Sequence, residues 1–529
     1  MNFNAAESFL GIEFGSTRIK AVLVSSCGEV LAQGSCDWEN SLVNGVWTYS
    51  LEEVREGLRS AYASLKKNVA KSYGIVLSTV GAMGVSAMMH GYLAFDSSGK
   101  LLVPFRTWRN TITEEASEKL SLEFNVPVPQ RWSAAHLYQA VLNGEEHVRN
   151  IASFTTLAGY VHKMLTGQNV LGIGDASGMF PLDYKNKNYD KELLNKFDSL
   201  VKEFSVGWSI KNLLPKILCA GECAGTLTKE GALFLDPEGD LQAGCPLCPP
   251  EGDAGTGMVA TNSVLPRTGN VSAGTSVFAM VVLEKPLSKA YTNKIDVVAT
   301  PDGRAVAMAH ANNCTGDYDK WISLFAEAAR LLGAEFSRDE LYTKLLTASL
   351  NGDSDCGGII SCNYLSGESM TGFLSGRPFV VREQNSSFTL ENFMRSQIFS
   401  SLCALRTGMD ILFEEEHVAL ESLTGHGGFF KCGKVGSSAM ADAMHAPVTL
   451  LSTAGEGGPW GMALLACYMY ERQKGCAEEL SAWLSKKFFS NAKKTTLVPK
   501  EEDCLGFDAF YQKYKRAMAV ERAAVESVD

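Results

Sequence analysis

One short pattern occurs twice in this 529-residue chain and constrains its fold more than any other feature. In each copy, a glycine and two hydroxyl residues separate two apolar segments with the character of strands. The residues at the two tips are Gly15, Ser16 and Thr17 in the first copy and Gly274, Thr275 and Ser276 in the second. Each copy predicts a β-hairpin, from 9–14 into 19–24 and from 270–273 into 277–282.

The tips of both hairpins suit contact with phosphate. Backbone without a bulky Cβ can approach a phosphate closely, and the hydroxyl groups add hydrogen-bond donors. Taken singly, each tip is also explained by an ordinary tight turn. Because the pattern repeats at nearly half the chain length, we expect two related α/β domains around a central cleft, with the two hairpins holding a triphosphate across it.

The composition is that of a large globular protein. The residues are 46% hydrophobic and 20% charged, and a chain of this length is expected to divide into two or three domains. The formal net charge of −11 disfavours nucleic acid or an anionic membrane surface as a main partner. No apolar run approaches the roughly 18 to 20 residues that span a bilayer, so we expect a cytoplasmic protein.

Fourteen cysteines are scattered along the chain, which fits reduced thiols better than a disulfide framework. Cys219, Cys223, Cys245 and Cys248 have spacings that leave a tetrahedral zinc site open as an alternative. The Cys-x3-Cys half of this set is not a preferred zinc knuckle, so free thiols are the favoured interpretation.

Hydrophobic periodicity and turn signals give the secondary structure between these features. Ser50 and Glu53 form a capping-box pattern at the start of a helix over 51–70, and 81–88 is a short apolar strand. The stretch 244–257, rich in proline and glycine, is our domain boundary. Further helices are predicted at 113–122, 135–143, 160–165, 390–415, 463–472 and 507–525, with glycine-rich loops at 172–179, 425–436 and 454–461.

Two carboxylates stand beside the predicted hairpins. Asp253 lies on a glycine-flanked turn at the domain boundary, where it either caps the next helix or serves as the general base of a phosphoryl transfer to an alcohol. Glu13 ends the first strand, and a carboxylate in such a place needs a partner or a hydrated cation such as Mg²⁺. Lys20, on the returning strand, either reaches phosphate, pairs with an acid or stays solvated.

Two other segments carry candidate binding residues. His90 follows the strand at 81–88 between Met89 and Gly91; a lone histidine there is often a satisfied core residue, but the adjacent glycine favours a pocket. Trp108 and Asn110 stand in a polar segment that is either charged surface or a reader of sugar hydroxyls and apolar faces.

Two glycine-dense loops follow in the second half of the chain. The first contains Gly427 and Gly428, and the second is 454–461. Each could be a loop and nothing more. Together with the hairpins they provide the flat backbone surface that an adenosine group needs for close approach.

In this order, the motifs resemble those of the FGGY family of carbohydrate kinases, in the superfamily of actin, hexokinase and the heat-shock ATPases. The family typically has Asp-x-Gly-Thr in the first hairpin, a catalytic aspartate in Gly-x-Asp, Gly-Thr-Ser in the second hairpin and a late Gly-Gly loop for adenosine. The resemblance spans roughly residues 8 to 470. The matching residues here are Glu13 to Thr17, Gly252 and Asp253, Gly274 to Ser276, and Gly427 and Gly428.

The resemblance implies two ribonuclease-H-like (actin-like ATPase) domains, 1–255 for the sugar and the catalytic base and 256–529 for ATP. Within the family, residues 89–91 are similar to the Met-His-Gly of xylulokinases, where the histidine and the aspartate contact the ketose. Glycerol is disfavoured, because no Arg-Glu pair stands near that place. Three departures follow: Glu13 replaces the usual aspartate, the Trp-Asn-Asp-x-Arg segment is altered at 108–111, and bulky residues follow Gly428.

The expected activity is therefore Mg·ATP-dependent phosphorylation of a ketopentose, D-xylulose before others, to D-xylulose 5-phosphate. Asp253 would act as the base, Glu13 would hold Mg²⁺ through water, and Met89, His90, Gly91, Trp108 and Asn110 would bind the sugar. The ATP-binding residues would be Gly15, Ser16, Thr17, Lys20, Gly274, Thr275, Ser276, Gly427 and Gly428. Another sugar such as L-ribulose and a non-kinase actin-like ATPase remain alternatives. The oligomeric state stays open, with a homodimer as one option.

Overall fold

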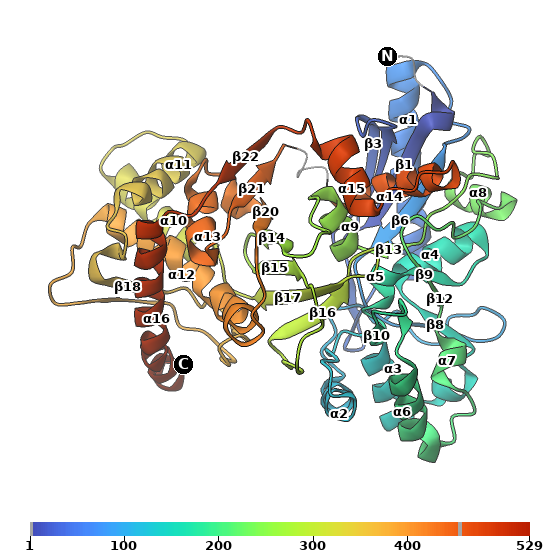
Figure 1. Ribbon diagram of the computed structural model, residues 1–529, viewed down its shortest axis with the longest axis horizontal. Helices are drawn as coiled ribbons and strands as arrows, with labels where there is room; N and C mark the ends of the chain where they lie inside the picture. The colour runs from blue at the N-terminus through green and yellow to red at the C-terminus, as the bar shows by residue number, and fades with distance from the viewer. Residues whose placement is uncertain (1–3, 453–456, 529) are drawn as a thin grey trace.

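The computed structural model describes residues 4–452 and 457–528, and a mixed β-sheet forms the centre of each of its two lobes (Figure 1). The sheet of the N-terminal lobe has the order β13-β6-β1-β2-β3. β1 pairs antiparallel with β2 and parallel with β6, so the first predicted hairpin is confirmed. The strands are β1 (Ser8–Phe14), β2 (Arg18–Ser25), β3 (Val30–Asp37), β6 (Ala82–Ala87) and β13 (Glu251–Gly252).

The sheet of the C-terminal lobe repeats this plan with additions at both edges. Its order is β16-β17-β15-β14-β20-β21-β22, and β14 pairs antiparallel with β15 and parallel with β20. The second predicted hairpin and the predicted α/β architecture of two related lobes are thereby confirmed. The strands are β14 (Thr268–Ala273), β15 (Val277–Val282), β16 (Ile295–Ala299), β17 (Ala305–Ala311), β20 (Ser422–His426), β21 (Val448–Leu451) and β22 (Lys494–Leu497).

Helices cover both faces of the N-terminal sheet. α1 (Leu51–Tyr73) and α4 (Leu157–Thr166) pack on one face, and α9 (Asp253–Ala260) and α14 (Gly457–Gln473) pack on the other. α14 comes from the last quarter of the chain and crosses β1 at Gly11, where an ideal Cβ would lie 1.9 Å from the carbonyl oxygen of Pro459. The close approach therefore requires glycine at this point of β1.

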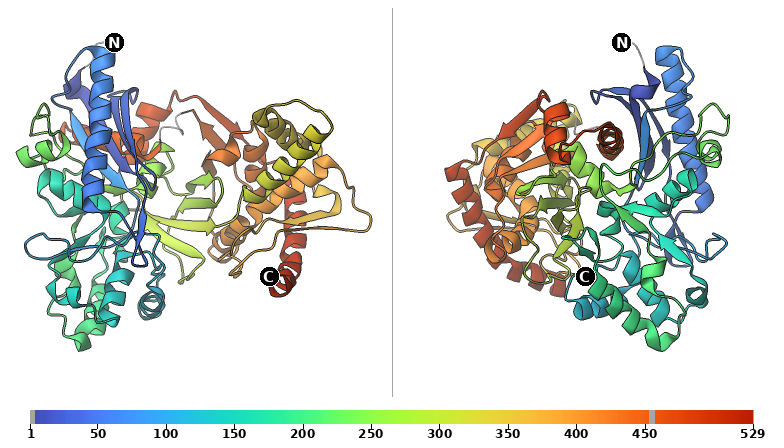
Figure 2. Two further views of the ribbon diagram at one scale, coloured as in Figure 1. Left: turned by 180° about the vertical axis from the view of Figure 1, so that it is seen from behind. Right: turned by 45° about the vertical axis from the view of Figure 1, so that its right-hand side comes forward.

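The remaining helices and short strands complete the two lobes, and Figure 2 shows the chain ends on opposite lobes. The other helices are α2 (Glu114–Phe124), α3 (Ser133–Leu142), α5 (Ile173–Ala176), α6 (Lys191–Val201), α7 (Ile210–Leu213), α8 (Lys229–Leu235), α10 (Gly316–Leu331), α11 (Arg338–Ala348), α12 (Leu390–Asp410), α13 (Val435–Met444), α15 (Leu480–Leu484) and α16 (Glu501–Ser527). The short strand pairs are β4 (Ser41–Val43) with β5 (Val46–Thr48), β7 (Leu93–Phe95) with β8 (Ser153–Thr155), β9 (Val170–Gly172) with β12 (Lys216–Leu218), β10 (Leu182–Asp183) with β11 (Asn188–Tyr189), and β18 (Ile359–Cys362) with β19 (Phe379–Arg382). None of the helices in the described parts of the chain has the length and apolar character needed to cross a membrane.

Local sequence signals predicted some helices, α1, α4 and α12 among them, but not α6, α10, α11 or α13. The capping box at the start of α1 is confirmed: Ser50 Oγ accepts the amide N–H of Glu53, and Glu53 Oε2 accepts that of Ser50. The glycine-rich loop predicted at 172–179 is wrong in part, because α5 forms there. Its first turn is held by the distant carboxylate of Glu251, which accepts the amide N–H groups of Gly174 and Asp175.

The prediction of a loop at 454–461 can be compared with the structure only from residue 457 onward. Residues 454–456 lie outside the described residues, and α14 begins at Gly457. The helix therefore begins within the predicted loop, and it packs on β1.

The hairpin of β16 and β17, at one edge of the C-terminal sheet, contacts the N-terminal lobe; we call it the C-terminal edge hairpin. The amide of Ala299 donates to Ser177 Oγ at 3.0 Å, and the amide of Ala220 donates to the carbonyl oxygen of Pro301 at 2.8 Å. Lys187 Nζ donates to the carbonyl oxygen of Asp302 at 2.9 Å. These contacts fix one edge of the second sheet against the first lobe.

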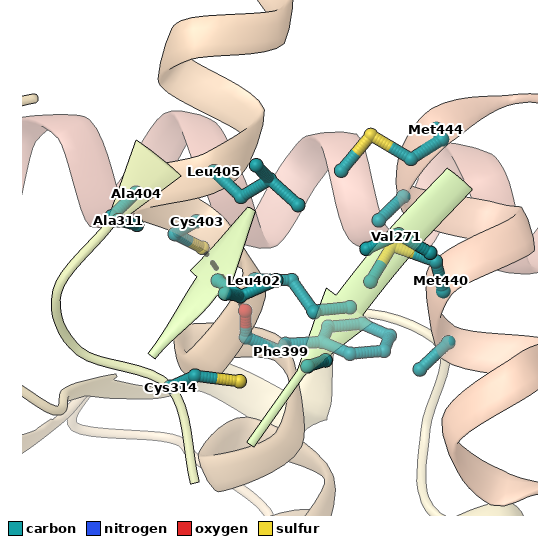
Figure 3. Packing of buried hydrophobic residues seen from close by; sticks show 14 of the residues in the cluster. Val271, Ala311, Cys314, Phe399, Leu402, Cys403, Ala404, Leu405, Met440 and Met444 are labelled. Atoms are coloured by element: carbon teal, nitrogen blue, oxygen red, sulfur yellow. Dashed lines mark hydrogen bonds between the residues drawn. The ribbon is translucent and has the colours of Figure 1, made fainter. Parts of the chain in front are cut away.

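α12 forms the centre of the C-terminal core. Its buried face presents Phe399, Leu402 and Leu405, which pack near Val271 of β14 and Met440 of α13 (Figure 3). Leu402 is fully buried. The core therefore depends on the fit of a few large side chains between one helix and the sheet.

Truncation of this core should be costly. We expect Leu402→Ala to lower the free energy of unfolding by about 2 to 5 kcal/mol, because it removes buried methyl groups and leaves a cavity. Urea denaturation followed by circular dichroism measures the change. Leu332→Ala, at a side chain that is 86% exposed, is the control and should change stability by less than about 0.5 kcal/mol. Equal effects of the two substitutions would contradict the packing shown for α12.

Candidate active site

A cavity of about 340 Å³ lies where the two lobes meet. Both lobes contribute to its walls, so it is not a pocket of the first lobe alone. The residues that line it are Ser16, Met88, Met89, His90, Trp108, Arg131, Asp253 and Ala254 from the N-terminal lobe and Phe278, Val298, Met308 and His310 from the second sheet.

The wall from the second sheet follows from strand register. Phe278 of β15 lies opposite His310 of β17, and Met308 of β17 lies opposite Asp296 of β16. Since alternate residues of a strand share one face, these side chains and Val298 stand on the same side of the sheet. The sequence analysis did not find this wall, because alternation alone does not say which lobe an edge hairpin will face.

Asp253 stands at the junction of the lobes with its side chain open to the cavity. It is the first residue of α9, and Gly252 occupies the cap position, so the carboxylate does not cap this helix from the N-cap. Asp253 Oδ1 accepts the amide N–H groups of Met89 at 3.3 Å and Ala254 at 2.9 Å. The surrounding walls displace water from the carboxylate and raise the pKa of Asp253 to about 6.

Glu13 lies close to Asp253 near the end of β1. Its cross-strand neighbour is Lys20, and Ser86 Oγ donates to Glu13 Oε2 at 3.5 Å. Desolvation, followed by the charge of Asp253, raises the pKa of Glu13 to about 8, against the opposing effect of Lys20. Gly458 of α14 presses against this carboxylate, since an ideal Cβ there would lie 1.5 Å from Glu13 Oε2.

The two carboxylates fit a divalent cation by their chemistry. They repel each other in a poorly solvated place, and a cation between them would remove that repulsion. Among the described residues, no group of three or more His, Cys, Asp or Glu side chains could hold a metal ion. A cation here would therefore complete its coordination with water and phosphate oxygens, as Mg²⁺ commonly does.

A second pair of acids lies directly behind Asp253. Asp175 and Glu251 are both buried, at 0% and 1% exposed, and Asp175 Oδ2 accepts the hydroxyl of Thr156 at 2.6 Å. Asp175 Oδ1 is buried without a hydrogen-bond partner. Burial and then the charge of Asp253 raise the pKa of Asp175 to about 7, and burial and then the charge of Asp175 raise that of Glu251 to about 8. Sequence reasoning noted Asp175 only as a loop residue.

His90 is fixed at both ring nitrogens. Its backbone has a φ of 71°, in the left-handed region, and its Nδ1 lies 3.2 Å from the carbonyl oxygen of Gly178. Arg131 Nε donates to His90 Nε2 at 3.1 Å, so Nδ1 carries the proton that is donated to Gly178. Burial and then the charge of Arg131 hold the pKa of His90 well below its usual range. The imidazole is therefore neutral.

The other candidate sugar residues differ in their placement. Trp108 and Met89 line the cavity, whereas Gly91 (φ 88°) makes the turn beside it. Asn110 lies outside the lining and is 2% exposed. Its Oδ1 accepts the amide of Trp47 at 2.8 Å and its Nδ2 donates to the carbonyl oxygen of Trp47 at 2.8 Å, so it holds the β4–β5 hairpin in place.

The candidate phosphate residues lie at the tips of the two hairpins. Gly15 donates to the carbonyl oxygen of Arg18 at 3.0 Å, and Gly274 donates to that of Ser276 at 2.9 Å, so both tips are tight turns. Thr17 and Thr275 are exposed at these turns. Ser16 instead lines the cavity, and Lys20 stands opposite Glu13.

The late glycine pair adjoins the second hairpin. β14 and β20 pair in parallel with Ser272 opposite His426, which brings Gly427 and Gly428 beside the hairpin tip. Gly427 has a φ of 104°, and an ideal Cβ there would lie 2.3 Å from the carbonyl oxygen of Ala273. This close approach requires glycine at position 427.

The four cysteines of the zinc alternative show no metal-binding arrangement. All four are free thiols; Cys245 and Cys248 are buried, while Cys223 is exposed and Cys219 half-buried. Among the described residues, no group of three or more His, Cys, Asp or Glu side chains that could hold a metal ion includes these cysteines. The structure therefore gives the zinc alternative no support.

The buried acids make the stability of the protein depend on pH. The pKa of Asp175 in the folded protein, about 7, lies above the ordinary value of 3.8, so the folded state keeps a proton that the unfolded state releases between about pH 4 and 7. The wild-type protein therefore loses stability as the pH rises through that window. Asp175→Asn removes this cost, and its Tm relative to wild type should increase by a few degrees from pH 5 to 8.

Thermal unfolding at several pH values tests this expectation. Asp339→Asn, at an exposed aspartate of α11, is the matched control and should follow the wild-type pH profile. A difference in Tm between Asp175→Asn and wild type that stays constant with pH would show that Asp175 does not carry the proton.

Comparison with known proteins gives a consistent result. The chain is 22% identical to the xylulose kinase of Haemophilus influenzae over 456 residues, which cover 84% of this chain and 87% of that protein. The crystal structure of xylulose kinase from Rhodospirillum rubrum matches with a TM-score of 0.76 at 18% identity, covering 97% of this chain and 98% of that one. Gluconate kinase from Lactobacillus acidophilus matches with a TM-score of 0.77 at 16% identity, covering 97% and 98%.

The present chain and these two crystal structures share one fold, which is that of the actin-like ATPases. The model of the N-terminal domain of the FGGY carbohydrate kinases matches residues 8–236, and that of the C-terminal domain matches residues 269–470. Together the two matches account for most of the chain, in the expected order. The chain belongs to the FGGY family of carbohydrate kinases.

Proposed function

We propose that this carbohydrate kinase transfers the γ-phosphoryl group of ATP to a ketopentose, with D-xylulose as the first choice and D-xylulose 5-phosphate as the product. The observation that carries the proposal is the placement of Asp253 in a cavity with Met89 and His90, the residues of the Met-His-Gly segment. Several relatives at low identity are xylulose kinases, which supports the same substrate class. We infer that the enzyme is cytoplasmic and acts in xylose metabolism.

The proposed chemistry begins at Asp253. With a pKa of about 6, its carboxylate is mainly ionised at neutral pH and can accept the proton of the C5 hydroxyl as that oxygen attacks the γ-phosphorus in line. The hydroxyls of Thr17 and Thr275, on the two hairpin tips, would donate to the phosphate oxygens. Mg²⁺ held by Glu13 through water would supply charge neutralisation on those oxygens.

The remaining residues are assigned by position. We propose a domain boundary near residue 255, with the catalytic base and sugar contacts in 1–255 and the ATP contacts mainly in 256–529. ATP would lie against Gly274, Thr275 and Ser276, with adenosine near Gly427 and Gly428, and Gly15, Ser16 and Lys20 would approach its phosphates from the first hairpin. Membership of the carbohydrate kinases sets aside the alternative of a non-kinase ATPase.

A panel of acceptors tests the substrate. ADP release with Mg·ATP should be fastest with D-xylulose among D-xylulose, L-ribulose, L-xylulose, D-ribulose, glycerol and gluconate. Faster turnover of another ketose, L-ribulose in particular, would keep the mechanism and reassign the cavity, where the segment after Trp108 departs from the family pattern. A preference for glycerol or gluconate would contradict the ketopentose proposal.

Replacement of the base should separate binding from chemistry. We expect Asp253→Asn to bind ATP and sugar nearly as well as wild type in calorimetric titrations, with kcat lower by about 10²-fold or more. In the wild-type enzyme, kcat/KM should fall as the pH drops through about 6, because Asp253 then becomes protonated. The Asp339→Asn control should keep wild-type kcat, and near-normal turnover of Asp253→Asn would remove this residue from the mechanism.

A further inference from the structure

Arg131 is a cavity residue that the sequence analysis did not single out. It lies between α2 and α3 in the N-terminal lobe and lines the same cavity as Asp253. Its side chain is 29% exposed, so part of the guanidinium group is open to the cavity. A group that offers five N–H donors in a fixed plane is well suited to bind several oxygens at once.

Two contacts fix the orientation of this guanidinium group. Nε donates to His90 Nε2 at 3.1 Å, and Nη2 forms an ion pair with Asp296 Oδ2. His90 is itself held by the carbonyl oxygen of Gly178, so its ring cannot rotate away without losing both contacts. Arg131 is therefore set between a fixed imidazole and a carboxylate.

The ion pair joins the two lobes at the cavity. Asp296 belongs to β16 of the second sheet, 165 residues from Arg131 in sequence, and its side chain is 16% exposed. The next residue on the same face of β16 is Val298, a cavity wall residue. The position of Arg131 thus depends on the docking of the C-terminal edge hairpin.

The contacts of His90 limit what this ring can do. One nitrogen faces Gly178 and the other accepts from Arg131, so in this arrangement neither is free to bind a sugar hydroxyl. The second sheet adds three apolar wall residues, Phe278, Val298 and Met308, and one imidazole, His310, whose pKa is lowered first by burial and then by the charge of Arg131. Among the described residues that line the cavity, Arg131 is therefore the one with a permanently charged hydrogen-bond donor group.

We propose that Arg131 is a specificity-determining residue that binds the non-reacting oxygens of the sugar, and that Asp296 of the C-terminal lobe is its positioning residue. Because Asp296 neutralises the guanidinium charge, the pair favours an uncharged sugar over one that carries a carboxylate. This inference rests on the proposed ketopentose kinase activity and extends it to the opposite end of the substrate.

Kinetics of three variants test the roles. Arg131→Gln should lower kcat/KM for the preferred ketose by about 10- to 100-fold, the range for loss of a charge-assisted hydrogen bond to substrate. Asp296→Asn should raise KM for the ketose by about 10-fold and leave kcat within about twofold. It should also shift the ratio of kcat/KM for gluconate over the ketose upward, since Arg131 then carries an unbalanced charge.

A double variant, a conservative variant and a matched control test whether Asp296 acts through Arg131. Arg131→Gln combined with Asp296→Asn should be no worse than Arg131→Gln alone, because Asp296 acts only through Arg131. Arg131→Lys should not rescue KM, since an ammonium group cannot replace the planar fork that spans His90 and Asp296. Asp302→Asn, on the same hairpin and paired with Arg304 outside the cavity lining, should keep wild-type KM.

Circular dichroism and Tm confirm that each variant is folded before its kinetics are compared. Wild-type KM in Asp296→Asn, or additive effects in the double variant, would overturn the inference while the kinase activity stands. A wild-type enzyme that turns over no ketose would overturn the proposed function and this inference with it, so the two failures are distinguishable.

Discussion

The docking of the β16–β17 hairpin on the N-terminal lobe is the contact on which the site depends. Hydrogen bonds from Ala299 to Ser177 and from Ala220 to Pro301 hold the edge of the second sheet in place. Without this contact the apolar wall of Phe278, Val298 and Met308 would not close the cavity. The cavity is thus a property of the joined lobes, although most of its polar groups come from the first.

Desolvation at this junction then sets the chemistry. The same walls that exclude water raise the pKa of Asp253 and Glu13, and burial also raises the pKa of Asp175 and Glu251 behind them. Such an arrangement costs folding free energy at neutral pH, which a lobe interface without a functional demand would not need. It gives Asp253, the base of the proposed mechanism, a pKa of about 6, and it makes a cation favourable between Asp253 and Glu13.

The sequence predicts those features of the fold that depend on residues close to one another in the chain. Both hairpins and the Ser50–Glu53 capping box follow from local turn and cap chemistry, which tertiary structure did not override. By contrast, α5 is held by Glu251, 76 residues away from Asp175 in the chain, and Arg131 acquires its place only from Asp296. The burial of Asn110 depends on the packing of β5, which adjacency to Trp108 does not reveal.

The structure also divides the site into a part that is built and a part that is open. The cavity around Asp253 has walls from both lobes, and His90 and Arg131 are fixed within it. The two hairpin tips are different, because Thr17 and Thr275 are exposed and only their backbone carbonyl oxygens accept hydrogen bonds among those described. In the proposed function, the phosphates would therefore meet the less constrained part of the site, whereas the docked edge hairpin holds the walls of the cavity around Asp253.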